Sequence, residues 1–209
     1  MLLLLASTFA ALSCKKENVE HTPTYSAAEI EAFKEMTVKG GNLIQKLPSF
    51  VGIYLTDTLR PHLTRMSDTI IKQLNEYLLN RVQFKRVLNR SESIIQVHFT
   101  GPNSLNTLGY ATVSVNNGRI DSGGVYLDVV SSASNSLNQR RVYYHEFMHV
   151  LGFPGHVTNP RISSTLSTYV FYIQTGFSEF DEKMIRLLYS DAVQPGMNEQ
   201  QVHDVISKL

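Results

Sequence analysis

The sequence predicts an α+β domain in which a mixed, twisted sheet of four to five strands is covered by a long helix. Helical periodicity and strand-like composition predict the order helix, strand, long helix and then about four strands. Hydrophobic residues make up 43% of the 209 residues and charged residues 18%, which allows a core and argues against a disordered chain. No internal repeat or second linker is visible, so a single domain is expected.

The first half of this domain is expected to open on a helix over residues 26–38, which Gly40 and Gly41 end. Residues 49–56 are rich in β-branched and aromatic side chains and predict a strand. A long amphipathic helix is expected over residues 62–80, because its apolar residues recur at helical spacing. These apolar residues are Leu63, Met66, Ile70, Leu74, Tyr77 and Leu78.

Four further strands are expected after the long helix, at residues 81–88, 93–100, 109–115 and 124–130. Apolar and polar residues alternate in the second of these segments. An Asn-Asn-Gly turn at 116–118 and a glycine pair at the start of the last segment separate the final two strands. A three-layer arrangement of the same elements is the alternative to the α+β sheet with helices packed on it.

Three helices are expected to complete the domain. Ser136 and Gln139 have the spacing of a capping box, so a helix should begin near residue 137. A second helix is expected over residues 179–189, with its apolar residues on one side. A short last helix is expected over 199–208, with Asn198 as its cap.

Charge and cysteine content exclude several classes of protein. Nineteen Lys and Arg face eighteen Asp and Glu, for a formal net charge of +1, so no strongly basic face and no nucleic-acid partner is expected. The chain has one cysteine, which excludes a disulfide framework and a thiolate zinc site. A metal site in this chain would therefore be built from histidines and carboxylates.

The N-terminal segment indicates export. Residues 2–12 form an apolar run too short to span a bilayer but of the length found in secretory signals. Small residues lead into Cys14, and the segment resembles a bacterial lipobox, which implies cleavage before the cysteine and its acylation. We therefore expect a signal over 1–13, a flexible tether over 14–25 and one domain over 26–209, lipid-anchored at the bacterial cell envelope. A simple signal peptide or a membrane-touching tail is the alternative.

Residues 145–156 contain His-Glu-x-x-His, then a glycine and a further histidine. On a helix, His145 and His149 lie about 40° apart on one face. Two imidazoles so placed can ligate one Zn²⁺, and Glu146 beside them can exchange a proton with a water bound there. The pattern therefore predicts a zinc site with a general base.

The same helix has a separate apolar face. Tyr144, Phe147, Met148 and Leu151 form a stripe at i, i+3, i+4 and i+7, which is expected to pack on the sheet. The two histidines lie on a different face of the helix. They are therefore not expected to be core packing residues.

Gly152 and Pro154 are expected to end this helix, because glycine can adopt positive φ and proline cannot continue the helix. The chain can then turn back under the helix end, so that His156 supplies a third ligand. Three protein ligands and a water form the open site that catalytic zinc needs. A downstream acid is the alternative third ligand, with Glu179 and Glu182 as candidates.

The stretch 145–156 resembles the signature of the metzincin zinc peptidases, His-Glu-x-x-His-x-x-Gly-x-x-His. Both histidines of the helix, the glutamate and Gly152 match in place, whereas the third histidine is expected at position 155 and His156 stands one residue later. Residues 178–189 resemble the closing helix of matrixin-type metzincins. The resemblance implies a metzincin-like fold and zinc-dependent peptidase activity.

Metzincins carry a methionine in a turn below the zinc, and this chain departs from that pattern. By position the turn falls at residues 164–167, where Leu166 replaces the methionine and supplies an apolar floor. Met197, in a Pro-Gly-Met turn, is the alternative. The ending that runs from Leu188 to this turn also resembles an uncharacterised family of bacterial exported proteins.

The other candidate side chains are expected to have structural and not catalytic roles. The histidines away from the motif lack metal-ligand spacing and are expected to be surface or hydrogen-bonded residues: His21, His62, His98 and His203. Tyr169 and Tyr172 could stabilise a developing oxyanion, although a packing role is favoured among 10 tyrosines.

The leading hypothesis is a monomeric zinc-dependent endopeptidase with His145, His149 and His156 as ligands and Glu146 as general base. Its protein or peptide substrate would lie extended along the strand at 109–115. The second hypothesis is a non-catalytic surface lipoprotein that keeps zinc for structure. A zinc amidase acting on cell-wall peptides is a third possibility.

Overall fold

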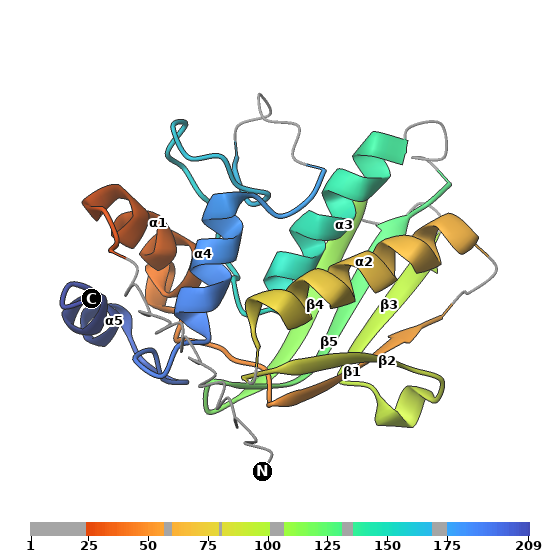
Figure 1. The fold of residues 1–209 in the computed structure, drawn as a ribbon, viewed down its shortest axis with the longest axis horizontal. Helices are drawn as coiled ribbons and strands as arrows, with labels where there is room; N and C mark the ends of the chain where they lie inside the picture. The colour runs from red at the N-terminus through yellow and green to blue at the C-terminus, as the bar shows by residue number, and fades with distance from the viewer. Residues whose placement is uncertain (1–23, 57–59, 80, 101–106, 131–135, 169–174) are drawn as a thin grey trace, which may run out of the picture.

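The computed structural model describes residues 24–56, 60–79, 81–100, 107–130, 136–168 and 175–209 (Figure 1). These residues form the predicted α+β fold around one mixed sheet, with strand order β2-β1-β3-β5-β4. The strands are β1 (Phe50–Leu55), β2 (Gln83–Val87), β3 (Ile95–Thr100), β4 (Gly109–Asn116) and β5 (Arg119–Asp128). The first half of the chain thus supplies one edge and the centre of the sheet, and the β4–β5 hairpin supplies the other edge.

Parallel pairing joins four of the five strands. β1 pairs with β2 on one side and with β3 on the other, and β3 pairs with β5. β4 returns antiparallel to β5 and forms one edge of the sheet. Among the described residues, no strand pairs with the outward backbone groups of β4.

A two-residue turn closes the β4–β5 hairpin. Asn117 and Gly118 have φ of 49° and 75°, the positive pair that a tight hairpin turn requires. β5 therefore begins at Arg119, five residues before the predicted start at 124, and runs through the glycine pair. A Cβ on Gly123 would lie 3.2 Å from Val150 Cγ1. The absence of a side chain therefore allows a helix to pack closely on the sheet, and the strand continues through this residue.

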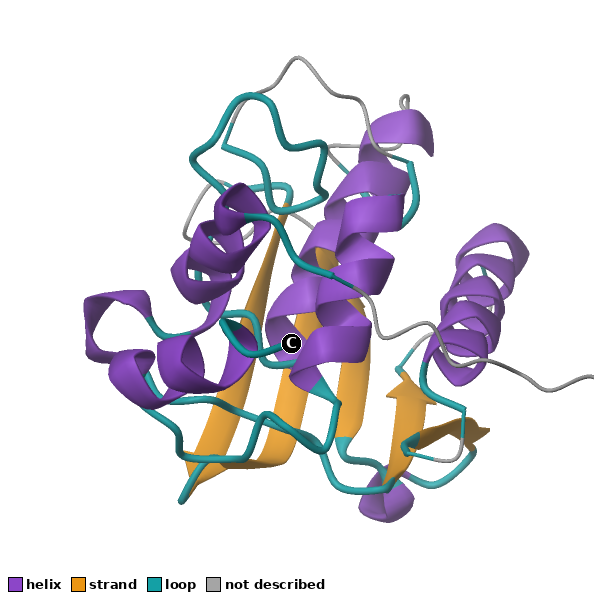
Figure 2. Cartoon of the chain, turned by 60° about the vertical axis from the view of Figure 1, so that its left-hand side comes forward, coloured by secondary structure: helices purple, strands orange, loops and turns teal. Residues whose placement is uncertain are grey.

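Five helices accompany the sheet within the described residues: α1 (Ala27–Thr37), α2 (Pro61–Tyr77), α3 (Ser136–Val150), α4 (Glu179–Leu188) and α5 (Glu199–Ile206). α2 and α3 lie across one face of the sheet, and α1, α4 and α5 gather beside it (Figures 1 and 2). The predicted cap of the last helix is confirmed, because Asn198 accepts a hydrogen bond from Gln201 N–H.

One part of the core lies between the sheet and α2 and α3, and the same cluster continues among α1, α4 and α5. Leu63, Ile70 and Leu74 of the predicted α2 stripe are fully buried in the part beside the sheet. Ser67 Oγ and Tyr143 Oη are 2.6 Å apart, so a buried hydrogen bond joins the two helices. None of the helices in the described part of the chain is long and apolar enough to cross a membrane.

Candidate metal centre

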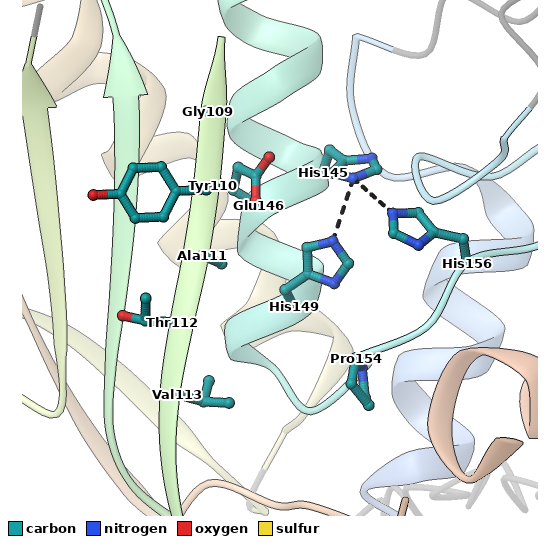
Figure 3. Close-up of a pocket in the computed structure, with 10 residues that line it drawn as sticks. All are labelled: Gly109, Tyr110, Ala111, Thr112, Val113, His145, Glu146, His149, Pro154 and His156. Carbon is teal, nitrogen blue, oxygen red and sulfur yellow. Dashed lines mark hydrogen bonds between the residues drawn. The ribbon is translucent and has the colours of Figure 1, made fainter. Parts of the chain in front are cut away.

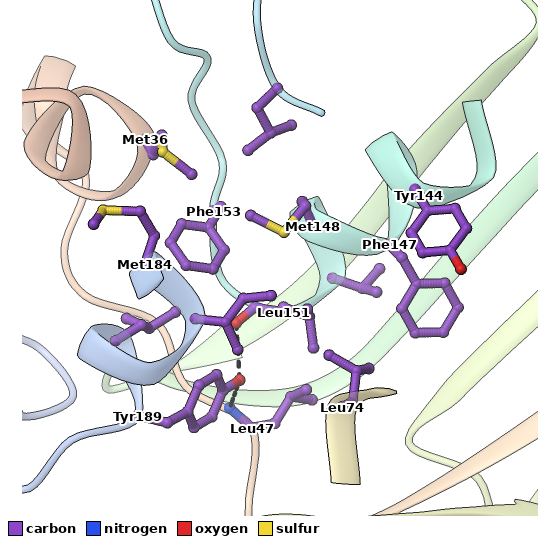
Figure 4. Close-up of a cluster of buried hydrophobic side chains, with 14 of the residues drawn as sticks. Met36, Leu47, Leu74, Tyr144, Phe147, Met148, Leu151, Phe153, Met184 and Tyr189 are labelled. Atoms are coloured by element: carbon purple, nitrogen blue, oxygen red, sulfur yellow. Dashed lines mark hydrogen bonds between the residues drawn. The ribbon is translucent and has the colours of Figure 1, made fainter. Parts of the chain in front are cut away.

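α3 separates its apolar stripe from its histidines as predicted. Tyr144, Phe147, Met148 and, just past the helix end, Leu151 are completely buried (Figure 4). This burial fixes the rotation of α3 on the sheet, since a helix buries one face at a time. The opposite flank of the helix then turns His145 and His149 towards a cavity.

Three imidazoles converge at one point (Figure 3). His145 Nε2 lies 3.3 Å from His149 Nε2 and 3.2 Å from His156 Nε2. Tetrahedral ligands about 2.05 Å from one Zn²⁺ would be about 3.3 Å apart, so the spacing fits that ion. Among the described residues, these three histidines are the one group of three or more metal-ligating side chains within reach of a common ion.

Backbone carbonyls set the orientation of two of these rings. His145 Nδ1 lies 2.7 Å from Thr165 O, and His149 Nδ1 lies 2.7 Å from Phe153 O. A carbonyl oxygen only accepts, so both Nδ1 atoms carry the proton and both Nε2 atoms present a lone pair. Two lone pairs that face each other at 3.3 Å repel unless a cation lies between them, so the donor set fits a metal ion and its geometry favours one.

Burial keeps the imidazoles available as ligands. Desolvation lowers the pKa of His149 to about 4 and also lowers the pKa of His145 and of His156. All three rings are therefore neutral near pH 7, the form in which histidine binds metals.

Gly152 redirects the chain after α3. Its φ is 105°, and a Cβ there would lie 2.2 Å from Gln45 O, so both the conformation and the space require glycine. The chain then turns back beneath the helix end and brings His156 to the other two histidines. Glu179 and Glu182 lie outside this group, and Glu182 instead pairs with Arg186 at 2.8 Å.

Glu146 lies in the same cavity as the histidines, between α3 and the edge strand. It is 7% exposed, and burial raises the pKa of its carboxyl to about 7. The close approach of the strand requires Gly109, because a Cβ there would meet Val142 Cγ1 at 2.5 Å and Glu146 Cγ at 3.2 Å. A carboxyl whose pKa lies near neutrality can both accept and return a proton.

The cavity has a volume of about 410 Å³ and runs along β4. Its lining comprises residues 109–113 of that strand, Pro154, Glu146 and the three histidines. Figure 3 shows the strand on one side and the imidazoles on the other. The arrangement is an open cleft with three potential metal ligands on one side and, within the described residues, an unpaired strand edge along its wall.

The turn at 164–167 lies beneath the site. Leu166, the predicted replacement for a methionine, is fully buried, and the preceding Thr165 supplies the carbonyl that orients His145. Met197 lies elsewhere: its carbonyl accepts a hydrogen bond from Ile44 N–H at 2.9 Å, and it does not line the cavity.

Asp181 is a site-supporting residue that sequence reasoning missed. It is fully buried in the first turn of α4, and its carboxylate accepts hydrogen bonds from Ser164 Oγ, Thr165 N–H and Ser178 N–H. It thereby fixes the turn whose carbonyl holds His145. The available signal was a serine cap with an acid three residues later at the start of the predicted closing helix.

We expect Asp181→Ala to lower the free energy of unfolding of the metal-free protein by about 3 kcal/mol or more, because it leaves buried donors without an acceptor. Urea unfolding at pH 7 measures this loss. Glu182→Ala is the control, because its exposed pair with Arg186 is worth at most about 1 kcal/mol. A loss below 1 kcal/mol for Asp181→Ala would contradict the assigned role.

The other histidines that the structure describes do not join the site. His98 stacks on Tyr126 with ring centroids 4.5 Å apart, His62 lines a groove beside α2, and His203 is exposed on α5. Cys14, His21, Tyr169 and Tyr172 lie outside the described residues, so the lipidation site and the oxyanion candidates stay predictions.

Comparison with known proteins does not assign the chain to a family. No family model and no curated protein matches the chain. A solved structure described as that of myroilysin is similar, with a TM-score of 0.46 and 16% sequence identity over 73% of this chain and 97% of the other. The functional assignment therefore depends on the residues of the site.

Proposed function

We propose that this protein is a zinc-dependent endopeptidase. The observation that carries the proposal is the convergence of three imidazoles, whose ligand nitrogens lie within 4.8 Å of one another, beside the buried Glu146. His145, His149 and His156 would hold the ion and leave a fourth position towards the cavity. The resemblance of residues 145–156 to the metzincin signature supports the same assignment.

Glu146 would act as the proton carrier of the reaction. Zinc bound at such a site polarises a peptide carbonyl and lowers the pKa of a water molecule towards 7. Glu146 would take a proton as the water attacks the carbonyl carbon and pass it to the nitrogen of the breaking peptide bond. The burial of Glu146 supports this role, because desolvation raises the pKa of its carboxyl and makes the carboxylate a stronger base than an exposed one.

The edge strand would bind the substrate. β4 forms one wall of the cavity, and within the described part of the chain its outward backbone groups have no neighbouring strand. A protein or peptide in extended form could pair with these groups and so place one peptide bond over the histidines. We further propose that the domain acts as a monomer at the bacterial cell envelope, lipid-anchored through Cys14, with no nucleic-acid partner.

Zinc analysis combined with digestion of a peptide library tests the function. We expect about one zinc per chain and cleavage within the peptides, which a chelator stops and added zinc restores. Stoichiometric zinc with no cleavage of any peptide would favour the surface-binding lipoprotein, and cleavage only of peptidoglycan fragments would favour the amidase. A protein that binds no zinc would overturn the proposal.

A further inference from the structure

We infer that Glu35, on α1, is a positioning residue for the metal centre, because it holds the loop that places His156 beside His145. The inference rests on the proposed zinc site. It adds a residue from an element more than 100 positions away from the motif in the sequence.

The Glu35 carboxylate accepts two hydrogen bonds from the loop just after His156. Oε2 accepts a hydrogen bond from Thr158 N–H at 3.0 Å, and Oε1 accepts one from Thr158 Oγ at 2.6 Å. Lys39 Nζ, in the short turn that follows α1, lies 2.9 Å from Oε1 and favours the charged carboxylate. The Glu35 side chain is only 10% exposed, although Thr158 itself lies at the surface.

A second anchor lies just before His156. Gly155 N–H donates to Met36 O at 2.9 Å, a carbonyl in the last turn of α1 that has no partner within the helix. A Cβ on Gly155 would lie 2.1 Å from Glu35 O, so only glycine allows this approach. The residue that stands where the metzincin signature expects histidine is thus the one that docks on α1.

His156 depends on these anchors more than its partners do. His145 and His149 belong to a rigid helix, and carbonyl acceptors orient their rings. His156 belongs to a loop, and the anchors that flank it hold its Nε2 3.2 Å from His145 Nε2. Val157 N–H also bonds to Leu166 O at 3.0 Å, so loss of Glu35 should loosen the loop without releasing it.

Zinc affinity of the full chain, measured by competition with a chromophoric chelator, tests the role. We expect Glu35→Ala to raise the Kd for Zn²⁺ by about 10- to 100-fold, the usual effect of removing a residue that orients a ligand. Glu35→Gln should be intermediate, because its amide oxygen still accepts a hydrogen bond from Thr158. Glu31→Ala is the matched control on the same helix, with a side chain 59% exposed, and should bind zinc like the wild type.

The visible absorption of the Co²⁺-substituted protein separates positioning from general stability. We expect Glu35→Ala to change this spectrum, because the coordination by His156 changes, whereas Glu31→Ala leaves it unchanged. Wild-type Kd and spectrum in Glu35→Ala would overturn the inference, even if the variant melts earlier. If that variant fails to fold, Thr158→Val replaces it: a raised Kd supports the inference and an unchanged Kd overturns it. Absence of zinc binding in the wild type would instead overturn the proposed function and the inference with it.

Discussion

Replacing Glu146 with glutamine is expected to lower kcat/KM for peptide hydrolysis by about 10²- to 10⁴-fold while zinc stays bound. Glu146 is 7% exposed in the cavity that the three histidines line, and burial raises the pKa of its carboxyl to about 7. Glutamine keeps the shape of the side chain but cannot accept or return the proton. Zinc content and cleavage of a fluorogenic peptide, measured on the same preparation, check both parts of this expectation.

Glu182→Gln provides the control for this variant. Glu182 forms a surface pair with Arg186 on α4 and lies outside the cavity, so its amide should leave activity and zinc content unchanged. Activity of Glu146→Gln within tenfold of the wild type would remove Glu146 from the mechanism. Loss of zinc together with activity would show instead that the carboxylate is needed to form the metal site.

Local periodicity predicted the elements that bury one face. The α2 residues Leu63, Ile70 and Leu74 recur at helical spacing and are all fully buried, as are Phe147 and Met148 of α3. The buried face of such a helix can be identified from its own sequence, because the apolar residues that face the core recur with the period of the helix. The rotation of α3, and with it the direction of its two histidines, could be derived in this way.

Contacts between distant segments could not be derived from local sequence. The glycine pair at the start of the predicted last strand looked like a boundary, but Gly123 makes room for Val150 of α3. The burial of Glu146 depends on the approach of Gly109, and the orientation of His145 depends on Thr165. Each of these pairings joins different elements, and nothing in the periodicity of either partner specifies the other.

The position of His156 depends both on local sequence signals and on contacts between distant segments. The sequence correctly predicted that Gly152 would end α3 and turn the chain back, so that a histidine one residue late could join its partners. It could not reveal what Gly155, the residue just before His156, contacts. In the structure Gly155 docks on the last turn of α1 immediately before the chain reaches His156.

Removal of the metal is expected to lower the melting temperature by about 5–15 °C. Zinc present at 100 to 1,000 times its Kd stabilises the folded state by about 2.7–4.1 kcal/mol, because it binds the assembled histidines and not the unfolded chain. Each kcal/mol shifts the melting temperature of a domain of this size by about 2–4 °C. Thermal unfolding with saturating zinc and with excess chelator measures the difference.

His149→Ala should abolish this zinc-dependent shift, because it removes one of the three ligands and leaves Phe153 O without its donor. The variant should melt below the metal-free wild type and respond to neither zinc nor chelator. His203→Ala is the control, since that histidine is exposed on α5 and lies outside the metal-ligating group. A zinc-dependent shift of undiminished size in His149→Ala would place the bound ion away from α3, because two histidines cannot hold zinc as tightly as three.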